Sequence, residues 1–369
     1  MKNLTCILLL SVVVLSSAQQ TRDSDLMKSL SFRTSFGVTL NYLLFVPENY
    51  NASVKYPLVV TLHGSGSTNV YQVDNNDQAH PWIEDDVQAQ WPHFIMAPQC
   101  PSGTWGGMGA STGKISDAAK AVLEAIEDLK KQYSLDTNRF IIGGFSLGGS
   151  GTYHMIEMKP DFWAAAVPCA AGGDSSKIEL MARTPIWHHH GSNDMDGAAL
   201  KRMSAALENH GYPVLRVTVD QVVNSPAGWR NEIRKGTKPE DIIFKNARPS
   251  YDSLVRAIES GERFIFQMFN GGDHESARLN ANHNPLLPKW AFSKVKGGGS
   301  TKIVMNLRSR DQAVGNRSIT RVYDLRGNLI RNSAFSNRGL HDLTNGYYIV
   351  NSGSIKGIDS RWSILLLTK

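Results

Sequence analysis

Residues 139–148 read Arg-Phe-Ile-Ile-Gly-Gly-Phe-Ser-Leu-Gly, an apolar run that ends in the glycine-flanked serine Ser146. The run predicts a buried strand, and the residues that follow it can be helical. A serine in this strand–turn–helix context is typical of a nucleophile elbow, where glycines avoid clashes between a very tight turn and its neighbours. The sequence therefore predicts Ser146 as a nucleophile, although a glycine-rich turn at the end of a strand gives the same pattern.

A second strand signal lies upstream, at residues 57–62, and it ends in His-Gly-Ser-Gly at residues 63–66. A flexible loop at this point can turn a backbone N–H toward the active centre. A tetrahedral intermediate needs two preorganised donors, and we expect them to be the N–H groups of Leu147 and Ser65. The alternative interpretation is a plain turn from a strand into a loop.

Two further strand signals each end in a candidate catalytic side chain. Residues 185–190 are followed by Gly-Ser-Asn-Asp, which ends in Asp194, and residues 264–269 are followed by Asn-Gly-Gly-Asp-His, which ends in His274. Open α/β sheets bind their ligands at the carboxyl ends of the strands. The order Ser146, Asp194, His274 is that of the α/β-hydrolase triad, and it predicts His274 as the general base and Asp194 as the residue that orients it.

Three other side chains compete for these roles. His283 is the rival base, but it lies nine residues beyond His274 and past the predicted end of the strand. Asp196 and Asp273 are the rivals to Asp194, and we expect Asp273 to shape its own loop.

Residues 188–190 are three consecutive histidines, which invites a metal interpretation. Strand alternation turns the middle ring away from its neighbours, and no carboxylate or cysteine has ligand spacing. We therefore expect no metal and no cofactor.

Among the other candidates, Trp229 and Trp105 are expected in packing and, as an alternative, in substrate contacts. Cys100 and Cys169 both follow predicted strands, and either one disulfide or two free buried thiols fits that placement.

Several spaced motifs together resemble the secreted esterases of carbohydrate esterase family 1. They are the serine turn and residues 42–50 (YLLFVPENY), 62–66 (LHGSG), 96–101 (MAPQCP) and 190–194 (HGSND). That family includes feruloyl and acetylxylan esterases, with polyhydroxybutyrate depolymerases and peptidases as relatives. The resemblance, over residues 28–295, implies a serine carboxylesterase that removes feruloyl or acetyl groups from xylan. The alternatives are a serine peptidase or other acyl hydrolase of the same fold, and a noncatalytic surface adhesion protein.

The chain departs from this family between the candidate acid and base, where residues 217–262 intervene. The segment contains Trp229, several charges and a predicted helix, and it is too polar for another core strand. We interpret it as an insertion that forms a cap or one wall of the pocket, with Trp229 as a stacking platform. A peripheral surface insertion is the alternative.

Composition and periodicity divide the chain into segments. Residues 1–18 have the pattern of a secretory signal peptide, and no stretch is long and apolar enough to predict a transmembrane segment. Residues 19–295 alternate strand and helix signals, which predicts a mostly parallel α/β sheet with helices on both faces and an antiparallel pair at residues 28–46. A Gly-rich linker at residues 296–300 precedes residues 301–369, whose short alternating strands predict a small module like a β-sandwich.

The basic charge of the chain lies in this last segment. Residues 301–369 carry eleven Lys and Arg against four Asp, a net charge of +7, whereas the whole chain carries +6. No nucleic-acid-binding motif accompanies the charge, so we expect an acidic surface or the secretion machinery as a partner rather than nucleic acid. The segment resembles the C-terminal sorting domains of the type IX secretion system and the basic terminal modules of enzymes from fibre-degrading bacteria. A solvated basic face on a β-module explains the charge equally well.

Overall fold

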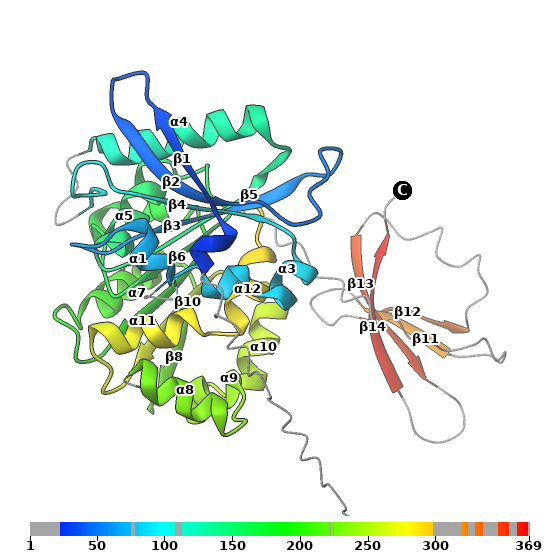
Figure 1. The fold of residues 1–369 in the computed structure, drawn as a ribbon. Coiled ribbons are helices and arrows are strands. Elements are labelled where there is room, and N and C mark those ends of the chain that lie inside the picture. The colour runs from blue at the N-terminus through cyan, green and yellow to red at the C-terminus, as the bar shows by residue number, and fades with distance from the viewer. Residues whose placement is uncertain are drawn as a thin grey trace, which may run out of the picture. The chain divides into compact units, whose positions relative to one another are not determined.

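The computed structural model describes residues 23–297 except 75–77, 108–112, 221–222 and 224, together with strands at residues 319–323, 329–334, 346–353 and 360–367. The chain divides into two compact units, Met1–Val304 and Met305–Lys369, and each is described by itself (Figure 1). The predicted signal peptide and the last part of the predicted linker lie outside the described residues.

The first unit is built on a ten-stranded sheet in the order β1-β2-β4-β3-β5-β6-β7-β10-β8-β9. The strands from β4 to β8 in that order are parallel, whereas β1, β2 and β9 run antiparallel to their neighbours. This arrangement confirms the predicted mostly parallel sheet and the antiparallel pair at one edge. The ten strands are β1 (Lys28–Arg33), β2 (Thr39–Phe45), β3 (Tyr56–Leu62), β4 (Phe94–Pro98), β5 (Leu135–Phe145), β6 (Ala165–Cys169), β7 (Ile186–Gly191), β8 (Leu215–Val219), β9 (Ala247–Arg248) and β10 (Phe264–Phe269).

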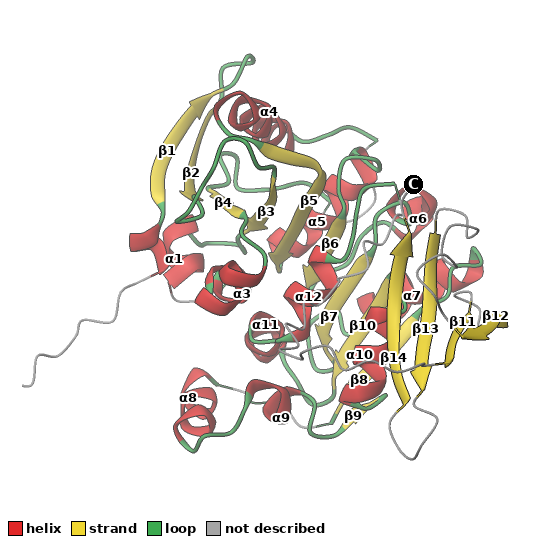
Figure 2. Ribbon diagram, turned by 90° about the vertical axis from the view of Figure 1, so that its right-hand side faces the viewer, coloured by secondary structure: helices red, strands yellow, loops and turns green. Residues whose placement is uncertain are grey.

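Helices cover both faces of the sheet because successive side chains of the buried strands point to opposite sides. In β7, for example, Ile186 packs into one apolar cluster and Trp187 into the other. Figure 2 shows the two helical layers on opposite sides of the sheet. The first layer consists of α4 (Asp117–Gln132), α5 (Leu147–Met158), α6 (Ile178–Met181) and α7 (Ala199–Asn209). The second consists of α1 (Asn69–Asp74), α2 (His80–Ile83), α3 (Asp85–Gln90), α8 (Pro226–Arg234), α9 (Pro239–Ile243), α10 (Tyr251–Glu259), α11 (His274–Asn282) and α12 (Leu286–Phe292).

The segment between the candidate acid and base contains a strand that the sequence interpretation rejected. Strand β8 overlaps the start of residues 217–262 and pairs in parallel with β10. Its side chains Val217 and Val219 are buried, whereas Arg216 is exposed. The expectation that this segment is too polar for a sheet strand was wrong, because a strand near the edge of a sheet needs apolar side chains only at alternate positions. The rest of the segment forms α8, α9, β9 and α10.

The second unit contains an antiparallel sheet in the order β12-β11-β13-β14. Its strands are β11 (Ile319–Tyr323), β12 (Leu329–Ala334), β13 (Gly346–Gly353) and β14 (Ser360–Leu367). The sandwich-like form of this module stays a prediction.

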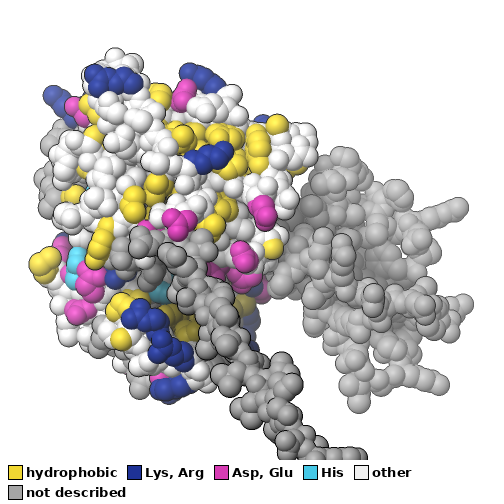
Figure 3. All heavy atoms as spheres, in the orientation of Figure 1, with side chains coloured by type: hydrophobic (Ala, Val, Ile, Leu, Met, Phe, Trp, Pro, Cys, Tyr) yellow, Lys and Arg dark blue, Asp and Glu magenta, His cyan; other side chains and the backbone are white. Residues whose placement is uncertain are grey.

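Both acidic and basic side chains are present on the face of the first unit that Figure 3 presents. Within the described ranges, no helix is long and apolar enough to cross a membrane.

Cys100 and Cys169 are both buried free thiols, which answers the question that the sequence left open about their pairing.

Candidate active site

Ser146 lies at the junction of β5 and α5 in a backbone conformation that side chains other than glycine rarely adopt. Its φ and ψ are 56° and −117°, so the turn holds the serine under strain. A Cβ atom on Gly148 would collide with the carbonyl oxygen of Leu62, and one on Gly144 would lie 2.5 Å from the carbonyl carbon of Gly148. The strand and the helix approach so closely that both positions require glycine, as a nucleophile elbow does.

Asp194 and His274 meet because β7 and β10 are parallel neighbours, so the loops that leave them emerge at the same edge of the sheet. The Nδ1 of His274 lies 2.9 Å from both carboxylate oxygens of Asp194. The two loops are in close contact, since a Cβ atom on Gly191 would lie 2.6 Å from the carbonyl oxygen of Asp273. The Asp194 side chain is only 3% exposed, so the carboxylate is shielded from solvent, whereas the His274 side chain is 26% exposed.

The environment of His274 favours its protonated form. The hydrogen bond to Asp194 is the largest cause that raises the pKa of His274 above its usual 6.5, and partial burial opposes it. The carboxylates of Glu275 and Asp273 raise the pKa further. The aromatic ring of Phe145 lies 4.6 Å from the imidazole, centroid to centroid, and covers one side of it. An imidazole held in this way is suited to take up a proton near neutral pH.

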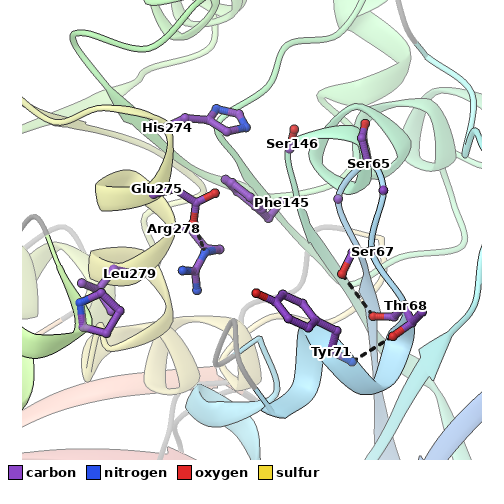
Figure 4. A pocket seen from close by; sticks show the side chains of 13 residues that line it. Ser65, Ser67, Thr68, Tyr71, Phe145, Ser146, His274, Glu275, Arg278 and Leu279 are labelled. Atoms are coloured by element: carbon purple, nitrogen blue, oxygen red, sulfur yellow. Dashed lines mark hydrogen bonds and ion pairs between the residues drawn. The ribbon is translucent and has the colours of Figure 1, made fainter.

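A pocket of about 800 Å³ brings the candidate nucleophile and base together. Figure 4 shows the imidazole of His274 pointing toward the hydroxyl group of Ser146, with Ser65 on the loop beyond it. Leu147 is the first residue of α5, and the N–H groups of a first helical turn have no acceptor within the helix. The pocket is lined by Gly64, Ser65, Gly66, Ser67, Thr68, Tyr71, Phe145, Ser146, Pro226, His274, Glu275, Arg278 and Leu279.

The three rival side chains have other partners. Asp196 forms an ion pair with Arg202 at 2.6 Å. Asp273 caps the N-terminus of α11, where its side chain accepts a hydrogen bond from the Ser276 N–H at 2.8 Å. His283 contacts the tilted rings of His80 and Trp229, and its Nδ1 lies 2.8 Å from the Leu279 carbonyl oxygen. Burial lowers the pKa of His283 to about 3, and none of the three rivals lines the pocket.

The two tryptophans singled out in the sequence lie away from the pocket lining. Trp229 is 7% exposed and packs its ring against His283 at 4.3 Å, centroid to centroid. Trp105 is 1% exposed, and its indole N–H donates to the His63 carbonyl oxygen at 2.9 Å. From the segment at residues 217–262, it is Pro226, at the start of α8, that lines the pocket.

Sequence reasoning missed three of the larger lining side chains. Phe145 and Arg278 come from the elements that carry Ser146 and His274, so their proximity to the candidate triad was a usable signal. Tyr71 is exposed and comes from α1, which follows the loop at residues 63–68. Nothing in the sequence around Tyr71 marks it as a pocket residue.

The three consecutive histidines divide between the two faces of β7. His188 and His190 contact each other on one face, whereas His189 stacks on Trp187 on the other, with ring centroids 5.4 Å apart. Across the described residues, no group of three or more His, Cys, Asp or Glu side chains is arranged to hold a metal ion.

Comparison with known proteins gives matches of the same fold. The model of the Prolyl oligopeptidase family matches residues 108–223. The bifunctional acetylxylan esterase/xylanase XynS20E of Neocallimastix patriciarum is 30% identical over 163 residues, which are 43% of this chain and only 22% of that protein. The solved structure of a thermostable esterase has a TM-score of 0.56 and 25% identity, with 74% of this chain and 64% of that chain covered.

A further relative is matched over most of its length. The protein named "Probable feruloyl esterase C" of Aspergillus oryzae is 30% identical over 255 residues, which are 68% of this chain and 82% of that protein. The chain therefore belongs to the family of α/β-hydrolase serine esterases that includes this feruloyl esterase C.

Proposed function

We propose that this protein is a secreted serine carboxylesterase that removes feruloyl or acetyl groups from plant cell-wall polysaccharide such as xylan. The observation that carries the proposal is the pair of 2.9 Å contacts between His274 Nδ1 and the Asp194 carboxylate, at a pocket that Ser146 also lines. The relatives named as feruloyl and acetylxylan esterases support the choice of ester.

The reaction proceeds in two acyl-transfer steps. His274 removes the proton of the Ser146 hydroxyl group as its oxygen attacks the ester carbonyl carbon, and Asp194 holds the imidazole tautomer and stabilises the imidazolium. The N–H groups of Leu147 and Ser65 stabilise the oxyanion. His274 then returns its proton to the leaving alcohol, and a water molecule activated by the same imidazole releases the acid from the serine.

The pocket lining supports an aromatic acyl group. Tyr71 is 53% exposed, and it lines the same cavity as Phe145 and Leu279. Figure 4 shows this ring across the pocket from His274. A ferulate ring placed against these side chains buries apolar surface, and an acetyl group is too small to reach both Ser146 and Tyr71.

The experiment compares esters that share the reaction but differ in acyl group. Ser146→Ala removes one oxygen atom and should abolish hydrolysis of methyl ferulate and of acetylated xylan while the protein stays folded. Tyr71→Ala should lower kcat/KM for methyl ferulate about tenfold and leave the small acetyl ester within about twofold, since one lost aromatic contact is worth on the order of 1.4 kcal/mol. Turnover by Ser146→Ala at the wild-type rate would refute the esterase, and equal Tyr71→Ala effects would refute the acyl assignment.

A serine peptidase is the second candidate, and the match to the Prolyl oligopeptidase family favours it. The Ser146 oxygen would then attack the carbonyl carbon of an amide, with His274 again as the base. The kcat/KM values for chromogenic dipeptide amides and for methyl ferulate separate the two classes. Loss of both activities in Ser146→Ala would assign them to the same site. A kcat/KM for the amides above that for the esters would replace the esterase proposal.

Export and the basic tail belong to the same proposal. We infer that residues 1–18 direct secretion and that the basic residues 301–369 bind an acidic surface or the secretion machinery, on the strength of their sequence pattern. Cell fractionation of the full chain and of a chain without residues 305–369 tests this inference. An unchanged distribution of the shortened protein would remove the sorting role.

A further inference from the structure

A row of buried polar side chains extends from Asp194 into the core, on the side away from the pocket. The Nε2 of His190 lies 3.5 Å from the Oδ2 of Asp194, and the Nδ1 of His190 lies 3.2 Å from the Nε2 of His188. The Nδ1 of His188 in turn lies 2.8 Å from the hydroxyl oxygen of Tyr153. We call Tyr153, His188 and His190 the polar row; all three side chains are completely buried.

The polar row connects the elements that carry the candidate nucleophile and acid. Tyr153 lies on α5, which begins directly after Ser146, whereas the two histidines lie on β7, which leads to Asp194. Strand β7 is completely buried, and polar side chains lose their hydration when they are buried. This desolvation costs free energy unless hydrogen bonds within the protein offset the cost. The contacts between Tyr153 and His188 and between His188 and His190 provide that offset, whereas the Nε2 of His190 has no hydrogen-bond partner among the described residues and faces the carboxylate.

The negative charge of Asp194 fixes the direction of the hydrogen bonds. The carboxylate repels a lone pair, so the Nε2 of His190 carries the proton and its Nδ1 is an acceptor. His188 then donates from Nε2 and accepts at Nδ1 from the hydroxyl group of Tyr153. In this arrangement the His188 ring uses one N–H and one lone pair, and the His190 ring uses its lone pair while its N–H faces the carboxylate without a hydrogen bond to any residue that the structure describes; both rings are neutral.

Burial keeps the row neutral. Desolvation is the largest cause that lowers the pKa of both His188 and His190 below 6.5. The neighbouring charges of Asp194 and Asp196 raise the pKa of His190 and that of His274 lowers it, but desolvation dominates. Desolvation also raises the pKa of Tyr153, so its hydroxyl group stays a donor.

We propose that the polar row positions the Asp194 carboxylate for His274 through the neutral imidazole of His190, whose Nε2 faces Oδ2 at 3.5 Å. The second oxygen has its own support, because the backbone N–H of Met195 donates to Oδ1 at 2.6 Å. The Met195 N–H holds Oδ1 by a hydrogen bond, whereas the Nε2 of His190 has no hydrogen-bond partner in the described part of the chain and faces Oδ2 at 3.5 Å, so its contact with the carboxylate is electrostatic. Because His190 carries no charge, the full negative charge of Asp194 acts on the imidazolium that forms at His274. His190, His188 and Tyr153 are thus positioning residues, and this role rests on the proposed triad.

Substitutions along the row test the proposal with the full chain and methyl ferulate as substrate. His190→Ala removes the imidazole that faces Oδ2 and should lower kcat at least about tenfold with KM within about twofold, because a small misplacement of catalytic groups is costly. His190→Gln should recover most of this loss, since its amide offers one donor and one acceptor at a similar separation. Tyr153→Phe removes only the hydroxyl group at the far end and should lower kcat about threefold.

His189→Gln is the matched control, because this neighbouring buried histidine faces the opposite side of β7 and contacts neither the row nor the pocket. It should change the thermal unfolding midpoint and leave kcat unchanged. Equal losses of kcat in His189→Gln and His190→Ala, or an unchanged kcat in both His190→Ala and Tyr153→Phe, would overturn the positioning role. If His190→Ala does not fold, the comparison of Tyr153→Phe with His189→Gln decides. Activity in Ser146→Ala would instead overturn the proposed esterase.

Discussion

The Nδ1 atom of His274 contacts both carboxylate oxygens of Asp194 at 2.9 Å, although the two residues are 80 positions apart in the chain. The contact exists because β7 and β10 are parallel neighbours that end at the same edge of the sheet. Because of this contact, the pKa of His274 depends on the charge of one buried carboxylate.

The pH dependence of the activity should report this contact. The hydrogen bond to Asp194 raises the pKa of His274 above 6.5, and only the neutral imidazole accepts the serine proton. The acidic midpoint of kcat/KM should therefore lie above 6.5. Asp194→Asn removes the main cause of the shift, so it should move the midpoint to lower pH and lower kcat roughly 10³- to 10⁴-fold, as expected when the acid of a triad is neutralised. A wild-type midpoint below 6.5 would contradict the assignment of the pair.

The same shift affects stability with a definite sign. A histidine with a raised folded-state pKa contributes stability below its unfolded pKa, and this contribution is lost as the pH rises through the folded pKa. Unfolding in urea at a series of pH values, with Asp194→Asn as the comparison, measures it. The wild-type advantage over Asp194→Asn should shrink as the pH increases.

The glycines of the elbow should be far less tolerant than other glycines. A methyl group on Gly148 meets the carbonyl oxygen of Leu62, which belongs to a buried strand and has little freedom to move. Gly148→Ala should therefore destabilise the protein by several kcal/mol and abolish esterase activity. Gly211→Ala is the control, because Gly211 has a positive φ of 81° but no atom within 4 Å of the added group. It should cost only about 1 kcal/mol in thermal or urea unfolding, and equal effects would refute the steric explanation.

His283 should matter for acid stability rather than for catalysis. Its folded-state pKa is lowered to about 3 by burial and by His80, so between pH 6.5 and 3 the unfolded chain binds a proton that the folded chain does not. Stability should fall as the pH drops below 6.5, by up to about 1.4 kcal/mol per pH unit from this group. His283→Gln should reduce this slope in urea unfolding.

The kinetic comparison for the two histidines is direct. His274→Ala should lower kcat by several orders of magnitude, whereas His283→Gln should retain it within about threefold. The reverse pattern would transfer the role of base to His283.

The elements that carry the candidate triad were predictable because each triad residue follows a strand signal that ends in a polar, glycine-containing loop. The spacing of Gly144, Ser146 and Gly148 predicts the tight turn directly from the sequence. Strand β8 was missed because only alternate side chains are fully buried, and a short strand with an exposed Arg216 and a half-buried Thr218 resembles a loop. Pocket residues such as Tyr71 depend on how α1 packs against the sheet, which no local pattern encodes.

The polar row illustrates the same limit. Alternation along β7 predicts that His188 and His190 share a face, and the structure agrees. The partner Tyr153 comes from α5, and its contact with His188 depends on the packing of that helix on the sheet. A sequence pattern therefore indicates which side chains point together, whereas contacts between elements require the fold.

The boundary between the two units gives the last prediction. All the proposed catalytic residues lie in the first unit, Met1–Val304. The end of its described part is well anchored: Trp290 and Phe292 of α12 are 0% and 2% exposed, and the Lys296 N–H donates to the Asn138 carbonyl oxygen at 2.9 Å. A chain that ends at Val304 should therefore keep its kcat/KM for methyl ferulate within about twofold.

A chain that ends at Asn284 is the matched comparison, because it loses α12 but keeps every proposed catalytic residue. Removing the two buried aromatic side chains exposes apolar surface worth several kcal/mol, so this chain should aggregate or unfold. Circular dichroism and turnover of methyl ferulate distinguish the two truncations. If the chain that ends at Val304 is folded by circular dichroism but does not turn over methyl ferulate, the second unit contributes to the site.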